Sequence, residues 1–210
     1  MSADIERYIK TLCDTIIFAR LNYDIWRVYT SPASRPTYLQ TMNRYRLFFQ
    51  TSRTAHLGAL VVLLYRLYET SPRHPTLNIP KLLKMAEEQK AVDNATLESL
   101  KQIYANEAKP LWTKAGILRN EWFAHLSVER SVDEIFDKAK VTPNELRKLI
   151  EVSERLLNKL TQARNRETHA FNVDAHDDTV WLLKDLQYAR EKRKAEEEEL
   201  RKQGDDKWDG

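Results

Sequence analysis

Cysteine is nearly absent from this sequence, and its rarity excludes two common kinds of scaffold. The 210 residues contain one cysteine, Cys13, so the chain can form no internal disulfide and no zinc site built from several cysteines. Cys13 lies in an apolar stretch with helical spacing, which favours a small core residue over a nucleophile. A chain of this length can bury a substantial core without such cross-links.

Glycine is also scarce, and no stretch shows the strict alternation of apolar and polar residues that marks a half-buried strand. Only four glycines occur, which argues against a fold rich in hairpins. Gly-rich phosphate loops and the glycine-flanked serine of many hydrolases are missing as well. The sequence therefore predicts an all-α fold.

The chain lacks a long apolar run and a basic N-terminal head. Its longest apolar stretch, 57–64, is far shorter than the roughly 18 residues that a membrane span needs. The first residues do not have the pattern of a secretory signal. Net charge is +3, which allows a polyanionic partner without requiring one. We expect a cytoplasmic protein that does not contact a membrane.

Helical periodicity, by contrast, is easy to find. Apolar residues recur every three or four positions over 5–26, which predicts one long amphipathic helix. A second long helix is expected from about 38 to 69, followed by a proline-containing loop at 70–76. Two shorter helices then begin near Pro80 and Asn94.

The second half of the chain continues in the same way. Pro110 is expected to open a helix that runs to about Leu126, with an irregular stretch after it. Thr142-Pro143-Asn144-Glu145 contains the residues of a capping box, so a long helix begins there. The last helix begins near Asp177.

These helices predict two regions. Residues 1–189 are expected to form one helical bundle, with two long helices, a short pair, a further helix and long C-terminal helices. Residues 190–210 are charged along almost their whole length, which is typical of a solvated helical extension or a frayed tail.

Metal-binding patterns are weak in this chain. No two of its five histidines have the spacing that places two ligands on one face of a helix. Acidic residues and histidines do cluster before the last helix, but the helix dipole favours such acidic residues without any metal. The cluster consists of His169, Asp174, His176, Asp177 and Asp178. We expect neither a metal nor another cofactor.

The strongest candidate for chemistry is Arg119-Asn120-Glu121-Trp122-Phe123-Ala124-His125. It resembles the Arg-x(4–6)-His motif of the HEPN superfamily, and most of all the Arg-Asn-x-x-x-Ala-His form of the abortive-infection U type, whose members are bacterial phage-defence proteins. The order of helices over roughly 5–187 is similar to that family as well. A second pair with this spacing, Arg164 and His169, lies at a helix end beside a polar loop and is the weaker candidate.

This resemblance implies a HEPN-like bundle that dimerises, with two motif helices meeting at one composite site of Arg119, Asn120 and His125. Helical geometry agrees with a shared site. In a straight α-helix Arg119 and His125 would lie about 120° apart around the axis and about 9 Å apart along it. One helix therefore does not bring them together, whereas two helices related by a two-fold axis can.

The resemblance also implies metal-independent cleavage of RNA by a toxin or phage-defence effector. His125 would carry protons, because an imidazole titrates near neutral pH. Arg119 would hold the phosphate and stabilise the transition state, while Asn120 would orient His125 or a phosphate oxygen. RNA is the expected substrate, and the expected partners are a second copy and an antitoxin or other regulatory protein. Ser127 stands where several toxin-like relatives carry a tyrosine, so we do not expect control through modification of that tyrosine.

Two other functions stay open. The chain could be a non-catalytic HEPN module that dimerises and binds RNA or protein, or a purely structural bundle in which His125 is an ordinary helix histidine. Aromatic residues interleaved with arginines on the long helices could stack on bases, yet core packing explains their helical spacing better. These residues are Tyr8, Tyr23, Trp26, Tyr45, Phe48, Phe49, Tyr65 and Tyr68.

Overall fold

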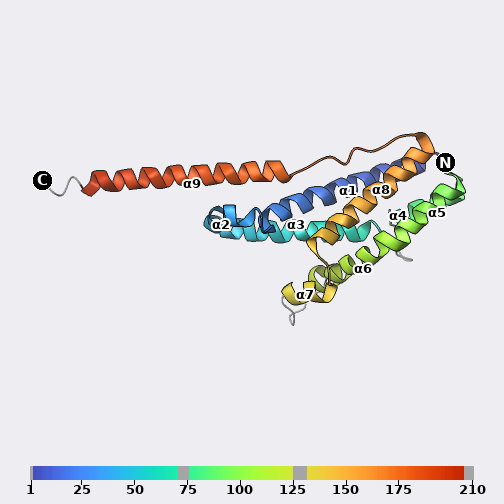
Figure 1. The fold of residues 1–210 in the computed structure, drawn as a ribbon, viewed down its shortest axis with the longest axis horizontal. Coiled ribbons are helices and arrows are strands. Elements are labelled where there is room, and N and C mark those ends of the chain that lie inside the picture. The colour runs from blue at the N-terminus through green and yellow to red at the C-terminus, as the bar shows by residue number, and fades with distance from the viewer. Residues whose placement is uncertain (1, 71–75, 125–131, 206–210) are drawn as a thin grey trace. The chain divides into compact units, whose positions relative to one another are not determined.

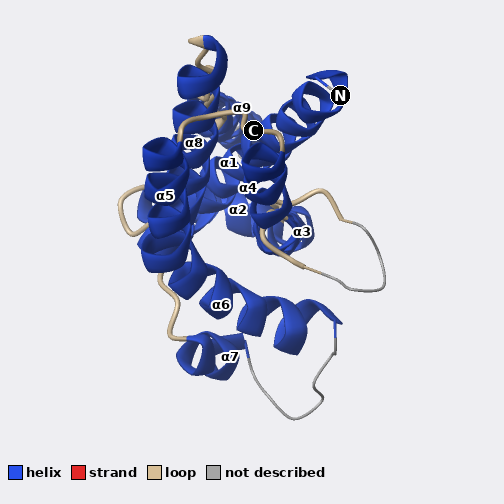
Figure 2. Cartoon of the chain, turned by 90° about the vertical axis from the view of Figure 1, so that its right-hand side faces the viewer, coloured by secondary structure: helices blue, strands red, loops and turns tan. Residues whose placement is uncertain are grey.

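The computed structural model describes residues 2–70, 76–124 and 132–205, and every secondary structure element in them is a helix (Figures 1 and 2). The all-α prediction is confirmed. The chain divides into two compact units. Unit 1 comprises residues 1–23 and 55–174, and unit 2 comprises residues 24–54 and 175–210.

Helix α1, Ser2–Thr30, is the long N-terminal helix that the periodicity predicts. Four of its apolar residues in unit 1 are almost completely buried, namely Ile5, Ile9, Leu12 and Ile16. Cys13 is buried beside them. Burial, with a smaller effect from the neighbouring Asp14 carboxylate, raises the pKa of the Cys13 thiol to about 12. The thiol is therefore protonated at neutral pH, and its interpretation as a core residue is confirmed.

The second long helix differs from the prediction. Instead of one helix over 38–69, the structure has α2, Arg35–Arg44, and α3, Arg46–Arg66. The backbone of Tyr45 leaves the helical region between them, with φ −111° and ψ 43°. Tyr38, Met42 and Phe49 on either side of this break are buried in one cluster. The apolar pattern therefore runs through the break and does not reveal it.

Helix α3 is the one helix in the described part of the chain whose length and composition alone would allow it to cross a membrane. Core helices of soluble proteins have the same property, and several apolar residues of α3 are buried inside unit 1, namely Leu57, Leu60, Val61 and Leu64. The uninterrupted apolar run at 57–64 is too short to cross a membrane, whereas the whole of α3 is long enough and apolar enough.

The predicted pair of shorter helices is present as α4, Ile79–Glu88, and α5, Asn94–Ile103. Each begins with a capping residue, Asn78 or Asp93, whose side chain accepts a hydrogen bond from a backbone N–H of the first turn. Helix α5 packs against α4. Local capping chemistry thus places both helices close to their predicted starts.

No loop follows α5. Residues Tyr104–Ala108 form a π-helical turn, η1, and α6, Lys109–Leu118, continues directly from it. Pro110 lies in the first turn of α6, as expected, but it does not start a separate helix. Proline removes one backbone hydrogen bond and crowds the preceding turn, and a π-helical turn is one way in which a helix accommodates such an irregularity.

The remaining helices are α7, Val132–Ala139, α8, Pro143–Asn165, and α9, His176–Asp205. Helix α7 lies in the stretch that was expected to be irregular. The sequence did not reveal it, because eight residues are too few for helical periodicity to be recognised. Helix α8 begins at the predicted capping box, in which Thr142 and Glu145 exchange hydrogen bonds. Helix α9 continues through the charged segment as far as residue 205.

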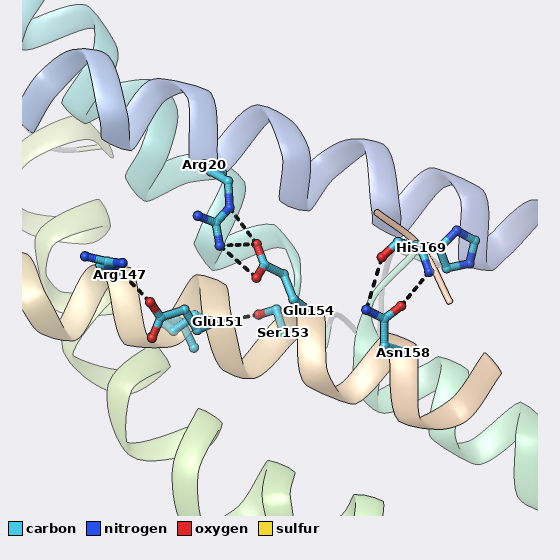
Figure 3. A network of polar contacts seen from close by, with 8 residues as sticks. Arg20, Arg147, Glu151, Ser153, Glu154, Asn158 and His169 are labelled. Atoms are coloured by element: carbon cyan, nitrogen blue, oxygen red, sulfur yellow. Dashed lines mark hydrogen bonds and ion pairs between the residues drawn. The ribbon is translucent and has the colours of Figure 1, made fainter. Parts of the chain in front are cut away.

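A two-pronged ion pair joins α1 to α8 within unit 1. Nε and Nη2 of Arg20 each donate to a carboxylate oxygen of Glu154 at 2.8 Å (Figure 3). The side chains are 24% and 14% exposed, respectively. Such paired hydrogen bonds fix direction as well as distance, so this contact sets how the two helices lie against each other.

Replacing Glu154 with alanine is expected to lower the free energy of unfolding by about 1–3 kcal/mol, because Arg20 would keep a mostly buried charge without its acceptor. Urea denaturation measures this loss. Glu151→Ala is the matched control on the same helix, since Glu151 pairs with Arg147 at the surface (Figure 3). The control should change stability by no more than about 0.5 kcal/mol. Equal losses in the two variants would contradict this role of the buried pair.

Unit 2 has a small core of its own. The buried residues of this core are Val28, Tyr29, Tyr38, Met42, Phe49 and Leu183. Helix α9 packs along α2 in this unit, and Nη2 of Arg193 donates a hydrogen bond to Oη of Tyr45 at 3.0 Å. The first turns of α9 thus complete the core that α2 and the neighbouring ends of α1 and α3 begin.

Candidate functional site

The predicted motif begins where α6 ends. Arg119 follows the last residue of α6, and Arg119–Ala124 form a second π-helical turn, η2. The expected α-helix to Leu126 is therefore α-helical only as far as Leu118. π-helical turns are rare and occur frequently at functional sites. The local backbone thus agrees with a special role for this segment.

An aromatic ring from α3 orients the Arg119 side chain. The central carbon of the guanidinium lies 5.0 Å from the centroid of the Tyr65 ring, and Nη1 of Arg119 donates a hydrogen bond to Oδ1 of Asn120 at 2.9 Å. A cation over a ring in a partly exposed place gains only about 0.5–1 kcal/mol. The ring therefore directs the guanidinium without neutralising its charge.

Tyr65 is in turn fixed by α6. The ring of Trp112 stacks on the Tyr65 ring, with centroids 5.7 Å apart and planes at 27°, and Nε1 of Trp112 donates to the Tyr65 carbonyl oxygen at 3.2 Å. A Cβ at Gly116 would lie 3.3 Å from the Tyr65 ring. Trp112, Gly116 and Arg119 have the spacing of one helical face, so the same face holds the ring and presents the guanidinium.

No carboxylate among the described residues is paired with the Arg119 guanidinium. Within the described part of the chain, Arg119 forms no ion pair, and its side chain is partly exposed beside the exposed Asn120. Glu121, two residues further on, forms an ion pair with Lys138 of α7. An oriented and uncompensated guanidinium is suited to binding an anion such as a phosphate.

His125, the third predicted site residue, lies outside the described residues, as does Ser127. The side chains of Arg119 and Asn120 are joined by a hydrogen bond. That His125 completes the same site stays a prediction.

The second pair with HEPN-like spacing has other partners. Arg164 forms an ion pair with Glu6 of α1. The side chain of Asn158 donates to the His169 carbonyl oxygen at 3.1 Å and accepts from the His169 N–H at 2.7 Å (Figure 3). These contacts hold the loop after α8 against that helix. Because Arg164 is already paired with the carboxylate of Glu6, Arg164 and His169 are a poorer candidate for binding phosphate than Arg119.

The acidic cluster before α9 has the arrangement of a helix start. Asp177 and Asp178 lie in the first turn of α9, and Nδ1 of His176 lies 3.0 Å from an oxygen of Asp177. Among the residues that the structure describes, no three histidine, cysteine or acidic side chains are grouped to hold a metal ion. Favourable interaction with the helix dipole accounts for the two aspartates.

Most of the aromatic residues on the long helices belong to the core. Tyr8, Tyr23, Trp26, Phe49 and Tyr68 are buried. Phe48 is instead 60% exposed, and Tyr65 supports Arg119. The sequence alone did not indicate that Tyr65, Trp112 and Gly116 are parts of the site. Trp112 and Gly116 could have been linked to Arg119 by their helical spacing. That spacing does not show that the Tyr65 ring packs against them.

The all-α fold and the Arg119-Asn120 pair at the end of α6 fit a HEPN-type helical protein. The family model HEPN_AbiU2, described as AbiU2, matches residues 2–180. The chain therefore belongs to the AbiU2 family of abortive-infection HEPN domains, and the predicted abortive-infection U type is confirmed. No curated protein and no solved structure matches the chain.

Proposed function

We propose that this protein is a metal-independent endoribonuclease of the HEPN type that acts in the cytoplasm as a toxin or phage-defence effector. The observation that carries the proposal is the state of Arg119, which Tyr65 orients and which no carboxylate in the described chain neutralises. Membership of an abortive-infection family supports the same function. Because such cleavage would harm the cell, we also propose that a regulatory partner protein restrains it.

RNA carries its own nucleophile in this reaction. One His125 takes the proton of a 2′-hydroxyl, whose oxygen then bonds to the adjacent phosphorus, and the bond from phosphorus to the 5′-oxygen breaks. A second His125 gives a proton to that leaving oxygen. Each proton transfer is typically worth about 10²–10⁴ in rate, and Arg119 stabilises the charge that builds up on the phosphate oxygens.

A second copy of the chain supplies the second imidazole in this proposal. The α-helical estimate of 120° between Arg119 and His125 does not apply to η2, because a π-helical turn is wider than an α-helical one. The need for a dimer rests instead on the chemistry, which uses one base and one acid at the same phosphate. A two-fold axis at the motif segments provides both from identical chains.

The chemical ends of the products test this mechanism. Digestion of a defined RNA in excess EDTA should give fragments that end in a 2′,3′-cyclic phosphate and begin with a 5′-hydroxyl. Mass spectrometry distinguishes these ends from those of metal-dependent hydrolysis. Activity that disappears with EDTA, or fragments with 3′-hydroxyl ends, would contradict the proposed mechanism.

A further inference from the structure

The distribution of charge along the chain is strongly uneven. Residues 25–68 contain six arginines and no aspartate, glutamate or lysine, although the whole chain has 31 acidic residues. This segment forms the end of α1, all of α2 and all of α3. Arginine, unlike lysine, combines a charge with a flat surface that stacks on rings and binds phosphate through two parallel hydrogen bonds. Such a composition points to a ligand that is both anionic and planar.

Three of these arginines line a single groove within unit 2. Arg35 comes from α2, and Arg46 and Arg53 come from α3, with the carboxamides of Asn43 and Gln50 between them. All five side chains are exposed. Among the residues that the structure describes, no acidic residue lines the groove and none forms an ion pair with any of the three arginines. The groove therefore collects positive charge that the described chain does not neutralise.

The helices hold these groups in a fixed arrangement. Arg46, Gln50 and Arg53 have the spacing of one face of α3. The floor of the groove is formed by the buried rings of Tyr29 and Phe49, which meet edge to face with centroids 5.3 Å apart. The backbone positions that carry the three arginines are thus fixed by a packed core, whereas the exposed arginine side chains become ordered when a ligand binds.

An exposed aromatic ring contacts Phe49, one of the two rings that line this groove. Phe48 is 60% exposed, and its ring meets the ring of Phe49 at 5.1 Å and 86°. Exposed aromatic rings next to arginines are the surface on which single-stranded nucleic acids stack their bases. An acidic peptide would use the arginines but would gain little from Phe48. Nucleic acid therefore fits the groove and the ring together.

We propose that the groove of Arg35, Arg46 and Arg53 binds single-stranded RNA, with the arginines on successive phosphates and Phe48 stacked on a base. The site belongs to unit 2, whereas Arg119 belongs to unit 1. The inference goes beyond the proposed cleavage, because binding at this groove uses neither Arg119 nor proton transfer.

Binding of a labelled 2′-O-methyl RNA of about 12 nucleotides, measured by fluorescence anisotropy with the full chain, tests the proposal. The methyl group blocks the 2′-oxygen, so binding is measured without cleavage. The double variant Arg46→Ala/Arg53→Ala should raise Kd at least about ten-fold and reduce the slope of log affinity against log salt by about 1.4, because each phosphate contact on a single strand contributes about 0.7.

The double variant Arg7→Ala/Arg201→Ala is the matched control. It removes two exposed arginines that lie outside the groove and form no ion pair within the described chain, and it should change Kd less than about two-fold. Phe48→Ala should raise Kd about five-fold or more with little change in the salt slope, because stacking releases no counterions. Circular dichroism checks that each variant keeps its helices.

Three results would overturn the proposal: no binding by the wild-type chain, equal losses in the groove and control variants, or equal competition by polyglutamate. The last would assign the groove to an acidic protein surface. The outcome is separate from the proposed cleavage. If the wild-type chain binds RNA through this groove but leaves ordinary RNA intact, the result supports the groove and contradicts the nuclease. If the variant without the groove arginines cleaves and binds RNA as well as the wild type, the result supports the nuclease and contradicts the groove.

Discussion

Alanine at position 119 is expected to slow RNA cleavage by about 10²–10³-fold, the usual cost of removing one group that stabilises charge in a transition state. The loss should appear mainly in kcat, because the phosphate gains most of its additional charge between substrate and transition state. Single-turnover cleavage of a short RNA measures the effect. The partly exposed position of Arg119 makes a large loss of stability unexpected.

Lysine at the same position separates charge from geometry. Arg119→Lys keeps a positive charge but loses the flat guanidinium that lies over Tyr65 and donates to Asn120. We expect intermediate activity, above alanine and below the wild type. Wild-type rates in both variants would show that Arg119 takes no part in the reaction.

Replacing Tyr65 with leucine is expected to lower activity by up to about 10²-fold, because displacement of a reacting group by about 1 Å can have that effect. Tyr65 is a positioning residue here, since it acts through Arg119. Leucine keeps an apolar side chain in place but removes the ring over which the guanidinium lies. Steady-state rates, with thermal unfolding measured in parallel, test this expectation.

Tyr65→Phe is the matched control for this prediction. Phenylalanine keeps the ring, and Trp112 bonds to the backbone oxygen of residue 65 rather than to its hydroxyl. The phenylalanine variant should therefore retain activity close to that of the wild type. Loss of activity in both variants would show that the hydroxyl group of Tyr65, rather than its ring, is needed. Full activity in the leucine variant would show that Tyr65 is not part of the site.

Local signals explain which parts of the fold the sequence could predict. The capping box at Thr142 and Glu145 is a chemical arrangement of neighbouring residues, and α8 begins there. Long periodic stretches likewise located α1. The break at Tyr45 has no such signal, since no glycine or proline marks it and the buried face continues across it. The two π-helical turns around α6 also depend on packing that periodicity does not record.

The candidate site was predictable to a similar extent. The motif identified Arg119 and Asn120, which the structure places in contact. It could not indicate Tyr65, which is more than fifty residues earlier in the chain and reaches Arg119 only because α3 packs on the face of α6 that carries Gly116. The weaker candidate, Arg164, could be set aside only when its partner Glu6 was seen on α1.

Cleavage of total RNA by purified protein in excess EDTA, compared between the wild type and His125→Ala, tests the proposed nuclease most directly. The proposed mechanism predicts cleavage by the wild type and a loss of about 10²-fold or more in a variant that stays helical, because general acid–base catalysis typically contributes about 10²–10⁴-fold. Equal cleavage by the two proteins would contradict the assignment of His125 as the proton carrier, and absence of cleavage by the wild type would contradict the proposed nuclease itself.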